Sequence, residues 1–221
     1  MGRVFRSGVL DHLDPADPVL AGLGIRTVID LRTHHERVAR PSRLPQDWAV
    51  GVWSRDYGAS GGDHAGRALP RSTEEAAAAM EKVYRRMPFE QAEAYRVMFL
   101  RIAAGDTPIL VHCLGGKDRT GVAVALLLDV LGAPRDSIRQ DYRLTDACLL
   151  RDHAVLEPGR VQGTADDEAA RAPLMAANPA YLDAMFDKLA KDFGGTAGYF
   201  EEVLGLDADV RTRVRMSLLE F

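Results

Sequence analysis

The sequence predicts an α/β domain with a small, mostly parallel sheet flanked by helices and a helix-rich C-terminal half. Two short runs of branched and apolar residues, 25–31 and 108–112, have the composition of buried strands. A short helix is predicted over 15–23, and a long apolar helix over 120–131 directly follows the second strand. Strands that alternate with helices in this way favour a parallel sheet covered by helices.

Between these two strands the sequence predicts one further possible strand, a loop and two helices. The possible strand is 48–53, and the Gly-rich, polar residues 54–70 are predicted to form a loop. A hydroxyl cap followed by acidic residues opens a helix over 72–87. We expect that helix to end there because Pro88 cannot continue it, and a second helix to follow over 89–104.

The rest of the chain is predicted to be almost entirely helical. Residues 157–167 are interpreted as a linker, and Asn178 and Asp207 are expected to cap the helices that follow them. The predicted helices are 135–150, 179–193, 197–204 and 208–219. A length of 221 residues suits one domain, so we expect a single domain over 1–221 with a possible helical elaboration over 157–221.

Composition and charge exclude several classes of protein. The net charge of -4 argues against a general nucleic-acid binder, which usually has a concentrated basic surface. The longest apolar run, 122–128, is too short to span a bilayer, so we expect no integral membrane contact. Two cysteines, Cys113 and Cys148, cannot form a disulfide framework. Without an apolar leader in the first residues, we expect a cytoplasmic protein, with export by a signal-less route as the alternative.

The segment 108–131 contains the chemistry, because it predicts a strand, a tight polar loop and a helix in that order. A loop that enters a helix N-terminus presents free N–H groups and the positive end of the helix dipole, which together bind anions. Gly115 and Gly116 allow the backbone of this loop to curl around an anion. Arg119 adds a fork of donors that matches two phosphate oxygens.

Cys113 stands at the mouth of this loop, where the same field favours thiolate over thiol. Thr120 is expected to donate a hydrogen bond to that sulfur, and His112 to tune it through the surrounding backbone. The expected reaction is in-line attack on a phosphate monoester, formation of a phosphocysteine intermediate and then attack by water. The reaction needs neither a metal nor a cofactor, and one Cys beside one His does not indicate a zinc site.

Residues 112–121, HCLGGKDRTG, place a cysteine, five intervening residues and Arg-Thr-Gly in one loop. This pattern resembles the protein-tyrosine phosphatase superfamily, and more narrowly the atypical bacterial phosphatases with a GKDRTG loop. Weaker likeness extends to residues 5–7, 29–32, 141–142, 198–199 and 204–206. The resemblance implies a tyrosine-phosphatase-like fold and activity on phosphotyrosine, phosphoserine or phosphothreonine, or phosphoinositides.

The donor of the proton to the leaving group has two candidates. The resemblance implies an acid at Asp118, inside the loop, whereas many tyrosine phosphatases have their acid where Asp56 stands, at the start of the predicted loop. Lys117 is interpreted either as a contact to a substrate phosphate or ring hydroxyl or as a solvated lysine. Phosphoinositide phosphatases often have a second basic residue directly after the cysteine, where this chain has the apolar Leu114. With Gly121, these residues complete the predicted phosphate-binding segment.

Asp30 and Arg32 end the first predicted strand, where ligands approach open α/β sheets. They are interpreted either as a buttress behind the catalytic loop or as a structural ion pair. The substrate stays open between a phosphorylated protein, a phosphoinositide and a small phosphorylated metabolite. A phosphate-binding pseudophosphatase and a rhodanese-like sulfur transferase are the alternatives in other classes.

Overall fold

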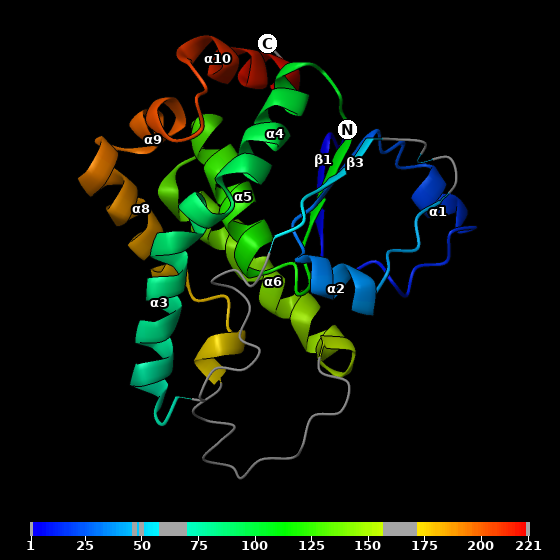
Figure 1. The fold of residues 1–221 in the computed structure, drawn as a ribbon, viewed down its shortest axis with the longest axis horizontal. Helices are drawn as coiled ribbons and strands as arrows, with labels where there is room; N and C mark the ends of the chain where they lie inside the picture. The colour runs from blue at the N-terminus through cyan, green and yellow to red at the C-terminus, as the bar shows by residue number, and fades with distance from the viewer. Residues whose placement is uncertain (1, 46–47, 49–50, 58–69, 157–171, 220–221) are drawn as a thin grey trace.

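Four short parallel strands form one sheet in this computed structural model, which describes residues 2–45, 48, 51–57, 70–156 and 172–219 (Figure 1). The spatial order is β1–β4–β2–β3, and every pairing is parallel. The strands are β1 (Val4–Ser7), β2 (Thr27–Asp30), β3 (Gly51–Ser54) and β4 (Ile109–His112). The sequence predicted β2, β3 and β4 in shifted bounds and missed β1. The predicted linker 157–167 and most of the predicted loop 54–70 lie outside the described residues.

The helices confirm the helix-rich architecture, and the N-caps predicted for two helices near the end of the chain are both formed. Asn178 accepts a hydrogen bond from the amide of Ala180, and Asp207 accepts one from the amide of Val210. The helices are α1 (Pro18–Ala21), α2 (His34–Ala39), α3 (Thr73–Glu90), α4 (Ala92–Ala103), α5 (Asp118–Val130), α6 (Arg135–Leu156), α8 (Pro179–Phe193), α9 (Thr196–Glu202) and α10 (Ala208–Leu218). None of the helices in these described ranges is long and apolar enough to cross a bilayer.

The expected helix end at Met87 is wrong, because α3 continues through Pro88 to Glu90. A proline near the end of a helix removes the hydrogen bond that its own N–H would have made and crowds the carbonyl four residues earlier. Burial offsets that loss, since Met87 and Pro88 are both buried and the Pro88 carbonyl accepts a hydrogen bond from the Tyr199 hydroxyl at 2.7 Å. The next helix therefore begins at Ala92 rather than at residue 89.

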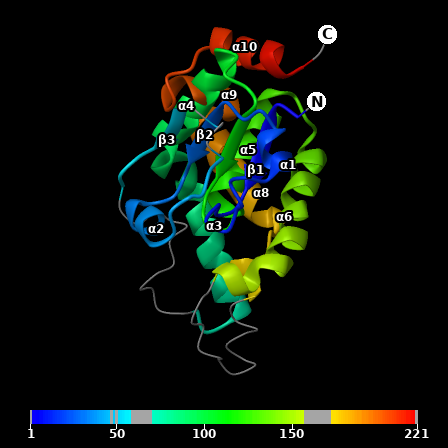
Figure 2. The same cartoon turned by 90° about the vertical axis from the view of Figure 1, so that its right-hand side faces the viewer.

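Side chains along a strand point alternately to the two faces of the sheet. The two faces are covered by different amounts of structure. Ile29 and Val111 belong to a large core shared with α3, α4, α5 and α8, whereas Val28 and Leu110 belong to a smaller core beneath the N-terminal segments. Figure 1 shows the large helical layer on one side of the sheet and α1 and α2 on the other. In Figure 2, α6 lies on the β1 side of the molecule and α2 on the β3 side.

The register of the strands aligns their carboxyl ends. Ser7 pairs with His112, His112 pairs with Asp30, and Asp30 pairs with Ser54. The segments that leave all four strands therefore emerge at one edge of the sheet, which is where open α/β sheets bind ligands.

Candidate active site

Cys113 immediately follows β4, and the loop that starts there ends where α5 begins at Asp118. The helix begins two residues before the predicted position, so Asp118 and Arg119 lie in its first turn. Lys117, at the N-cap, makes no side-chain capping hydrogen bond within the described chain. The amides at the start of α5 therefore have no side-chain cap, and they adjoin the loop as an anion site requires.

The end of β1 and the residues after it hold the loop from one side. The amide of Val9 donates to the Leu114 carbonyl at 2.8 Å. Gly116 has a φ of +65°, and a Cβ there would stand 2.8 Å from backbone atoms of Ser7 and Gly8. Only glycine fits such a position, because both the left-handed conformation and the close approach exclude a side chain.

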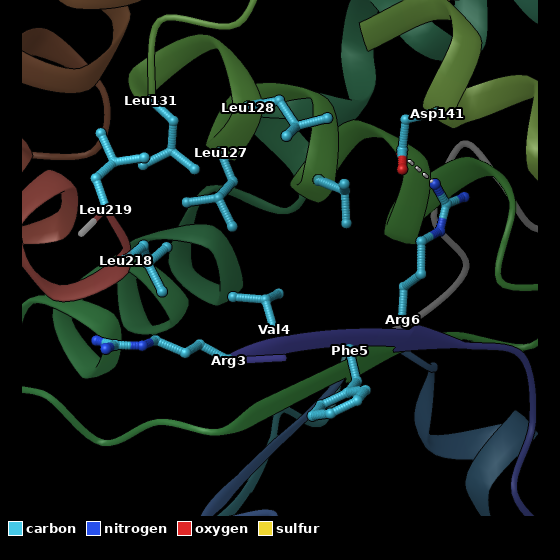
Figure 3. A pocket seen from close by; sticks show the side chains of 11 residues that line it. Arg3, Val4, Phe5, Arg6, Leu127, Leu128, Leu131, Asp141, Leu218 and Leu219 are labelled. Atoms are coloured by element: carbon cyan, nitrogen blue, oxygen red, sulfur yellow. Dashed lines mark hydrogen bonds and ion pairs between the residues drawn. The ribbon is translucent and has the colours of Figure 1, made fainter. Parts of the chain in front are cut away.

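Arg6 ties the same loop to α6. Its Nη2 donates to the Gly116 carbonyl at 3.2 Å and to Thr145 Oγ1, while its Nη1 pairs with Asp141 Oδ2 at 2.7 Å. Figure 3 shows the Arg6–Asp141 pair at one end of a pocket of about 570 Å³ between β1, α5 and the end of α10. Asp141, which lies in a segment that resembles the family, and Thr145 thus contact the arginine that binds the loop backbone.

Arg119 is buried and is held in place by several groups. Its Nη1 and Nη2 pair with the two carboxylate oxygens of Glu36, both at 2.7 Å, and Nη1 also donates to the Leu31 carbonyl at 3.0 Å. The Tyr95 hydroxyl donates to the backbone carbonyl of Arg119 at 2.9 Å. Burial would raise the pKa of Glu36, but the hydrogen bonds and charge of Arg119 outweigh it and lower that pKa.

Cys113 is a free cysteine, 2% exposed, close enough to Arg119 to interact with it electrostatically. The hydroxyl of Thr120 is buried and has no hydrogen-bond partner among the described residues, so the expected bond to the sulfur is not formed here. His112 is fully buried, with Nδ1 3.4 Å from the Cys113 carbonyl oxygen. Burial is the main cause that lowers the pKa of His112 to about 4, so the ring is neutral at physiological pH.

Asp30 and Arg32 form a buried ion pair, with 2.7 Å between Arg32 Nη2 and Asp30 Oδ2. Arg32 also donates to the Arg40 carbonyl and to Ser42 Oγ, away from Cys113 in the chain. Asp30 Oδ2 stands 3.6 Å from His112 Nε2, which is longer than a hydrogen bond. Asp30 and Arg32 are thus paired with each other, and Asp30 also faces the residue that precedes the cysteine.

Asp118 is largely buried and is contacted from two elements. The Tyr84 hydroxyl on α3 donates to Asp118 Oδ1 at 2.8 Å, and Lys117 Nζ pairs with the same oxygen. Lys117 is only 4% exposed and stands 6.0 Å from the centre of the Tyr84 ring. The structure therefore places Lys117 against Asp118 and Tyr84 rather than in solvent.

Asp56 lies at the same sheet edge but in a different environment. Its side chain is 76% exposed, and the contacts that it makes among the described residues are with His34 and Arg37 on α2. The adjacent Tyr57 donates to the Leu31 carbonyl, which is also an acceptor for Arg119. Asp56 is thus near the α2 side of the site, whereas Asp118 is the first residue of α5 and directly follows the loop.

Glu36 and Tyr84 belong to the site but were not predicted from the sequence. Thr33 and Glu36 form a capping box at the start of α2, and that Thr-x-x-Glu spacing is a readable signal for the helix. Glu36 also pairs with Arg119, which lies 83 positions away in the sequence, and no local pattern predicts that contact. Tyr84 has the periodicity of a core residue on α3, so its hydroxyl contact with Asp118 is also invisible before the fold is known.

Comparison with known proteins agrees with this geometry. A family model described as "Tyrosine phosphatase family" matches residues 1–220. The triple specificity protein phosphatase PtpB of Mycobacterium tuberculosis is 35% identical over 169 residues, which cover 64% of this chain and 60% of that protein.

Two further relatives match most of the chain. A tyrosine-protein phosphatase of Nostoc commune is 29% identical over 215 residues, covering 90% of this chain and 68% of the relative. A Cupriavidus necator protein, with a provisional tyrosine-protein phosphatase name, is 29% identical and covers 93% of this chain and 76% of its own length. Together with the cysteine loop, the match over nearly every residue establishes that the chain belongs to the tyrosine phosphatase family.

Proposed function

We propose that this chain hydrolyses phosphate monoesters with Cys113 as nucleophile, Arg119 as the phosphate-binding side chain and Asp118 as the general acid. In the first step Cys113 Sγ forms a bond to phosphorus while the phosphorus–oxygen bond of the ester breaks. Asp118 gives its proton to the departing oxygen. In the second step water attacks phosphorus, Asp118 takes a proton from that water, and the sulfur leaves as thiolate with release of phosphate.

One observation supports this proposal above the others: Arg119 is already fixed by Glu36 and Leu31, in the first turn of the helix that follows the Cys113 loop and close enough to Cys113 to interact with it electrostatically. A guanidinium held in this way needs little reorganisation when charge develops on the phosphoryl oxygens. The buried neighbours of Cys113 also exclude water from the sulfur. Leu114, Gly115, Gly116 and Thr120 supply the rest of the proposed phosphate cradle.

The contacts of Asp118 support it as the acid over Asp56. Asp118 is 18% exposed and is the first residue of the helix that directly follows the loop, whereas Asp56 is 76% exposed and paired with Arg37. A general acid must reach the leaving oxygen of a phosphate held by the loop, which favours the residue adjacent to the loop.

A phosphorylated protein is the first proposed substrate class, since a relative is named a triple specificity protein phosphatase. A phosphoinositide belongs beside it, because the resemblance of the GKDRTG loop implies that class as well. A small soluble phosphorylated metabolite is the second candidate, favoured by the apolar Leu114 beside the nucleophile. A phosphate-release panel of phosphopeptides, phosphoinositides, nucleotides and sugar phosphates separates them, with Cys113→Ser as the inactive control. The panel contradicts the whole proposal if no monoester is turned over faster by the wild type than by that control.

Rapid mixing tests the covalent step directly. After quenching with acid, wild-type protein should retain phosphate on Cys113 in a single turnover, and Cys113→Ser should not. Binding of the ester without a trapped phosphate or product release would instead support a pseudophosphatase.

The acid is tested by leaving-group dependence. Asp118→Asn should lower kcat/KM for phenyl phosphate about 100-fold and for dinitrophenyl phosphate only slightly, since a good leaving group needs no proton. The same measurement on Asp56→Asn should show similar small effects on both substrates. The opposite pattern, with selective loss in Asp56→Asn, would assign the acid to Asp56.

A further inference from the structure

Two buried phenols stand behind Asp118. Tyr84 on α3 is 0% exposed and donates to Asp118 Oδ1 at 2.8 Å, and Tyr142 on α6 is 1% exposed. The hydroxyls of Tyr84 and Tyr142 are hydrogen-bonded to each other. A line of polar groups therefore runs from α6 through α3 to the loop, inside an otherwise apolar core.

The direction of these hydrogen bonds follows from counting protons. A phenol has one proton to donate, and Tyr84 gives it to the carboxylate of Asp118. Tyr142 must then donate to the Tyr84 oxygen. Burial and, after it, the charge of Asp118 raise the pKa of both phenols, so both remain neutral donors throughout the working pH range.

The rings of both tyrosines are anchored, so the hydroxyl reaches Asp118 from a fixed point. The Tyr84 ring packs against Tyr142 with centroids 6.2 Å apart and against Tyr181 at 5.5 Å. Tyr142 can approach only because residue 121 is glycine, since a Cβ there would stand 2.8 Å from the Tyr142 ring. Gly121 of the loop motif thus admits the tyrosine that orients Tyr84.

Other buried phenols of this chain satisfy their hydroxyls on backbone carbonyls. Tyr95, Tyr181 and Tyr199 donate to the carbonyls of Arg119, Pro173 and Pro88, respectively. Any of these contacts satisfies a buried hydroxyl. Tyr84 instead donates to the side chain that the proposed function assigns as the acid, and this difference indicates a role beyond satisfying the phenol.

We propose that Tyr84, oriented by Tyr142, is a positioning residue for Asp118 in the proton transfer to the leaving group. This proposal rests on the proposed function. As the ester bond breaks, the proton of Asp118 passes to the leaving oxygen and negative charge develops on the carboxylate. A hydrogen bond to a charged acceptor is stronger than one to a neutral acceptor, so the Tyr84 contact strengthens as the proton leaves.

The test compares Tyr84→Phe with wild type on aryl phosphates of graded leaving-group acidity. We expect kcat/KM to fall about tenfold for phenyl phosphate and less than about twofold for dinitrophenyl phosphate, the loss expected of one charge-assisted hydrogen bond. Tyr142→Phe should show the same pattern with a smaller loss, because the Tyr84 hydroxyl is retained. Equal losses on all leaving groups in Tyr84→Phe would overturn the proposal.

Tyr199→Phe is the matched control, since it also removes a buried hydroxyl bonded to α3, through Pro88. It should leave the leaving-group dependence at the wild-type value even if it lowers Tm. Tyr84→Phe should add no further selective loss in an Asp118→Asn background, and an additive loss there would also overturn the proposal. If Asp118→Asn alone shows no leaving-group dependence, the assigned acid fails; if only Tyr84→Phe shows none, the positioning role fails.

Discussion

At the scale of single residues, the pairing of Arg119 with Glu36 determines how the site can hold phosphate. Both guanidinium nitrogens that face Glu36 lie 2.7 Å from its carboxylate oxygens, and the side chains are 4% and 12% exposed. Such a two-point contact fixes the plane of the guanidinium. Removing one partner of a buried pair leaves the other charge uncompensated, at a cost of about 3–5 kcal/mol.

Glu36→Gln should therefore weaken both folding and catalysis. We expect kcat/KM to fall at least about tenfold because the guanidinium loses its fixed orientation, and the free energy of unfolding at pH 7 to fall by a few kcal/mol. The exposed pair Arg55–Glu93 supplies the control, since Glu93→Gln should change stability by less than about 1 kcal/mol. Steady-state kinetics and urea denaturation measure both effects, and a Glu36→Gln protein with wild-type kcat/KM would contradict the assigned role.

The same variant has a defined pH signature. The pKa of Glu36 is lower in the folded state than in the unfolded state, so its contribution to stability is complete above the unfolded pKa. That contribution is lost as pH falls through the lowered, folded-state pKa. The difference in unfolding free energy between wild type and Glu36→Gln should thus shrink below about pH 4, and a constant difference down to pH 2.5 would argue against it.

At the scale of elements, the catalytic loop is shaped by the strand beside it as much as by the helix after it. The backbone of Gly116 lies against Ser7 and Gly8, and Arg6 from β1 binds the Gly116 carbonyl. This explains why an edge strand of four residues matters to the site. Strand β1 packs against one side of the loop, and the positive N-terminal end of α5 follows the loop.

Gly116→Ala should separate this packing from ordinary backbone strain. The added methyl would stand 2.8 Å from backbone atoms of Ser7 and Gly8, so the loop must move, and we expect kcat/KM to fall about 100-fold. Gly24→Ala is the control, since Gly24 has a similar φ of +61° but its added methyl would meet no atom within 4 Å beyond its chain neighbours. Gly24→Ala should cost about 1–2 kcal/mol and leave kcat/KM unchanged, and equal activity in the two variants would contradict the bracing role of β1.

At the scale of the whole molecule, the sequence was most informative where function occupies one contiguous segment. Residues 112–121 predict the phosphate-binding loop, because the strand, the glycines, the arginine and the helix follow one another within a few positions. Most helices were predicted because their apolar periodicity and caps are local, as at Asn178 and Asp207. Pro88 was misjudged because tertiary burial, which the local rule ignores, compensates for the lost hydrogen bond.

Contacts between segments that are distant in the chain could not be predicted from the sequence. Strand β1 has only four residues, and they form a strand because they pair with β4, more than 100 positions away. Glu36, Tyr84 and Arg6 each reach the loop from another element, and each has an ordinary local explanation as a cap, a core residue or a surface charge. One sequence is enough to identify the loop, but the side chains that hold the loop in place can be identified only once the fold is known.

The burial of His112 makes the whole fold sensitive to mild acid. The folded state keeps the ring neutral with a pKa of about 4, against 6.5 for an exposed imidazole, so between these values only the unfolded state binds the proton. Stability therefore rises with pH across this window, and acidification from pH 7 to 4.5 should cost up to about 3 kcal/mol through this residue. Asp30 adds a loss at lower pH, because its pKa is also lowered in the folded state: burial opposes this, but Arg32 prevails.

His112→Asn should flatten this dependence. Urea denaturation between pH 7 and 4.5 should show a smaller decrease in unfolding free energy for the variant than for wild type, even if the variant is less stable at pH 7. His34→Asn provides the matched control, because it makes the same substitution at a ring that is 63% exposed and leaves the buried ring of His112 in place. Identical slopes for wild type and His112→Asn would mean that the ring beside the nucleophile is protonated as readily in the folded chain as in the unfolded one.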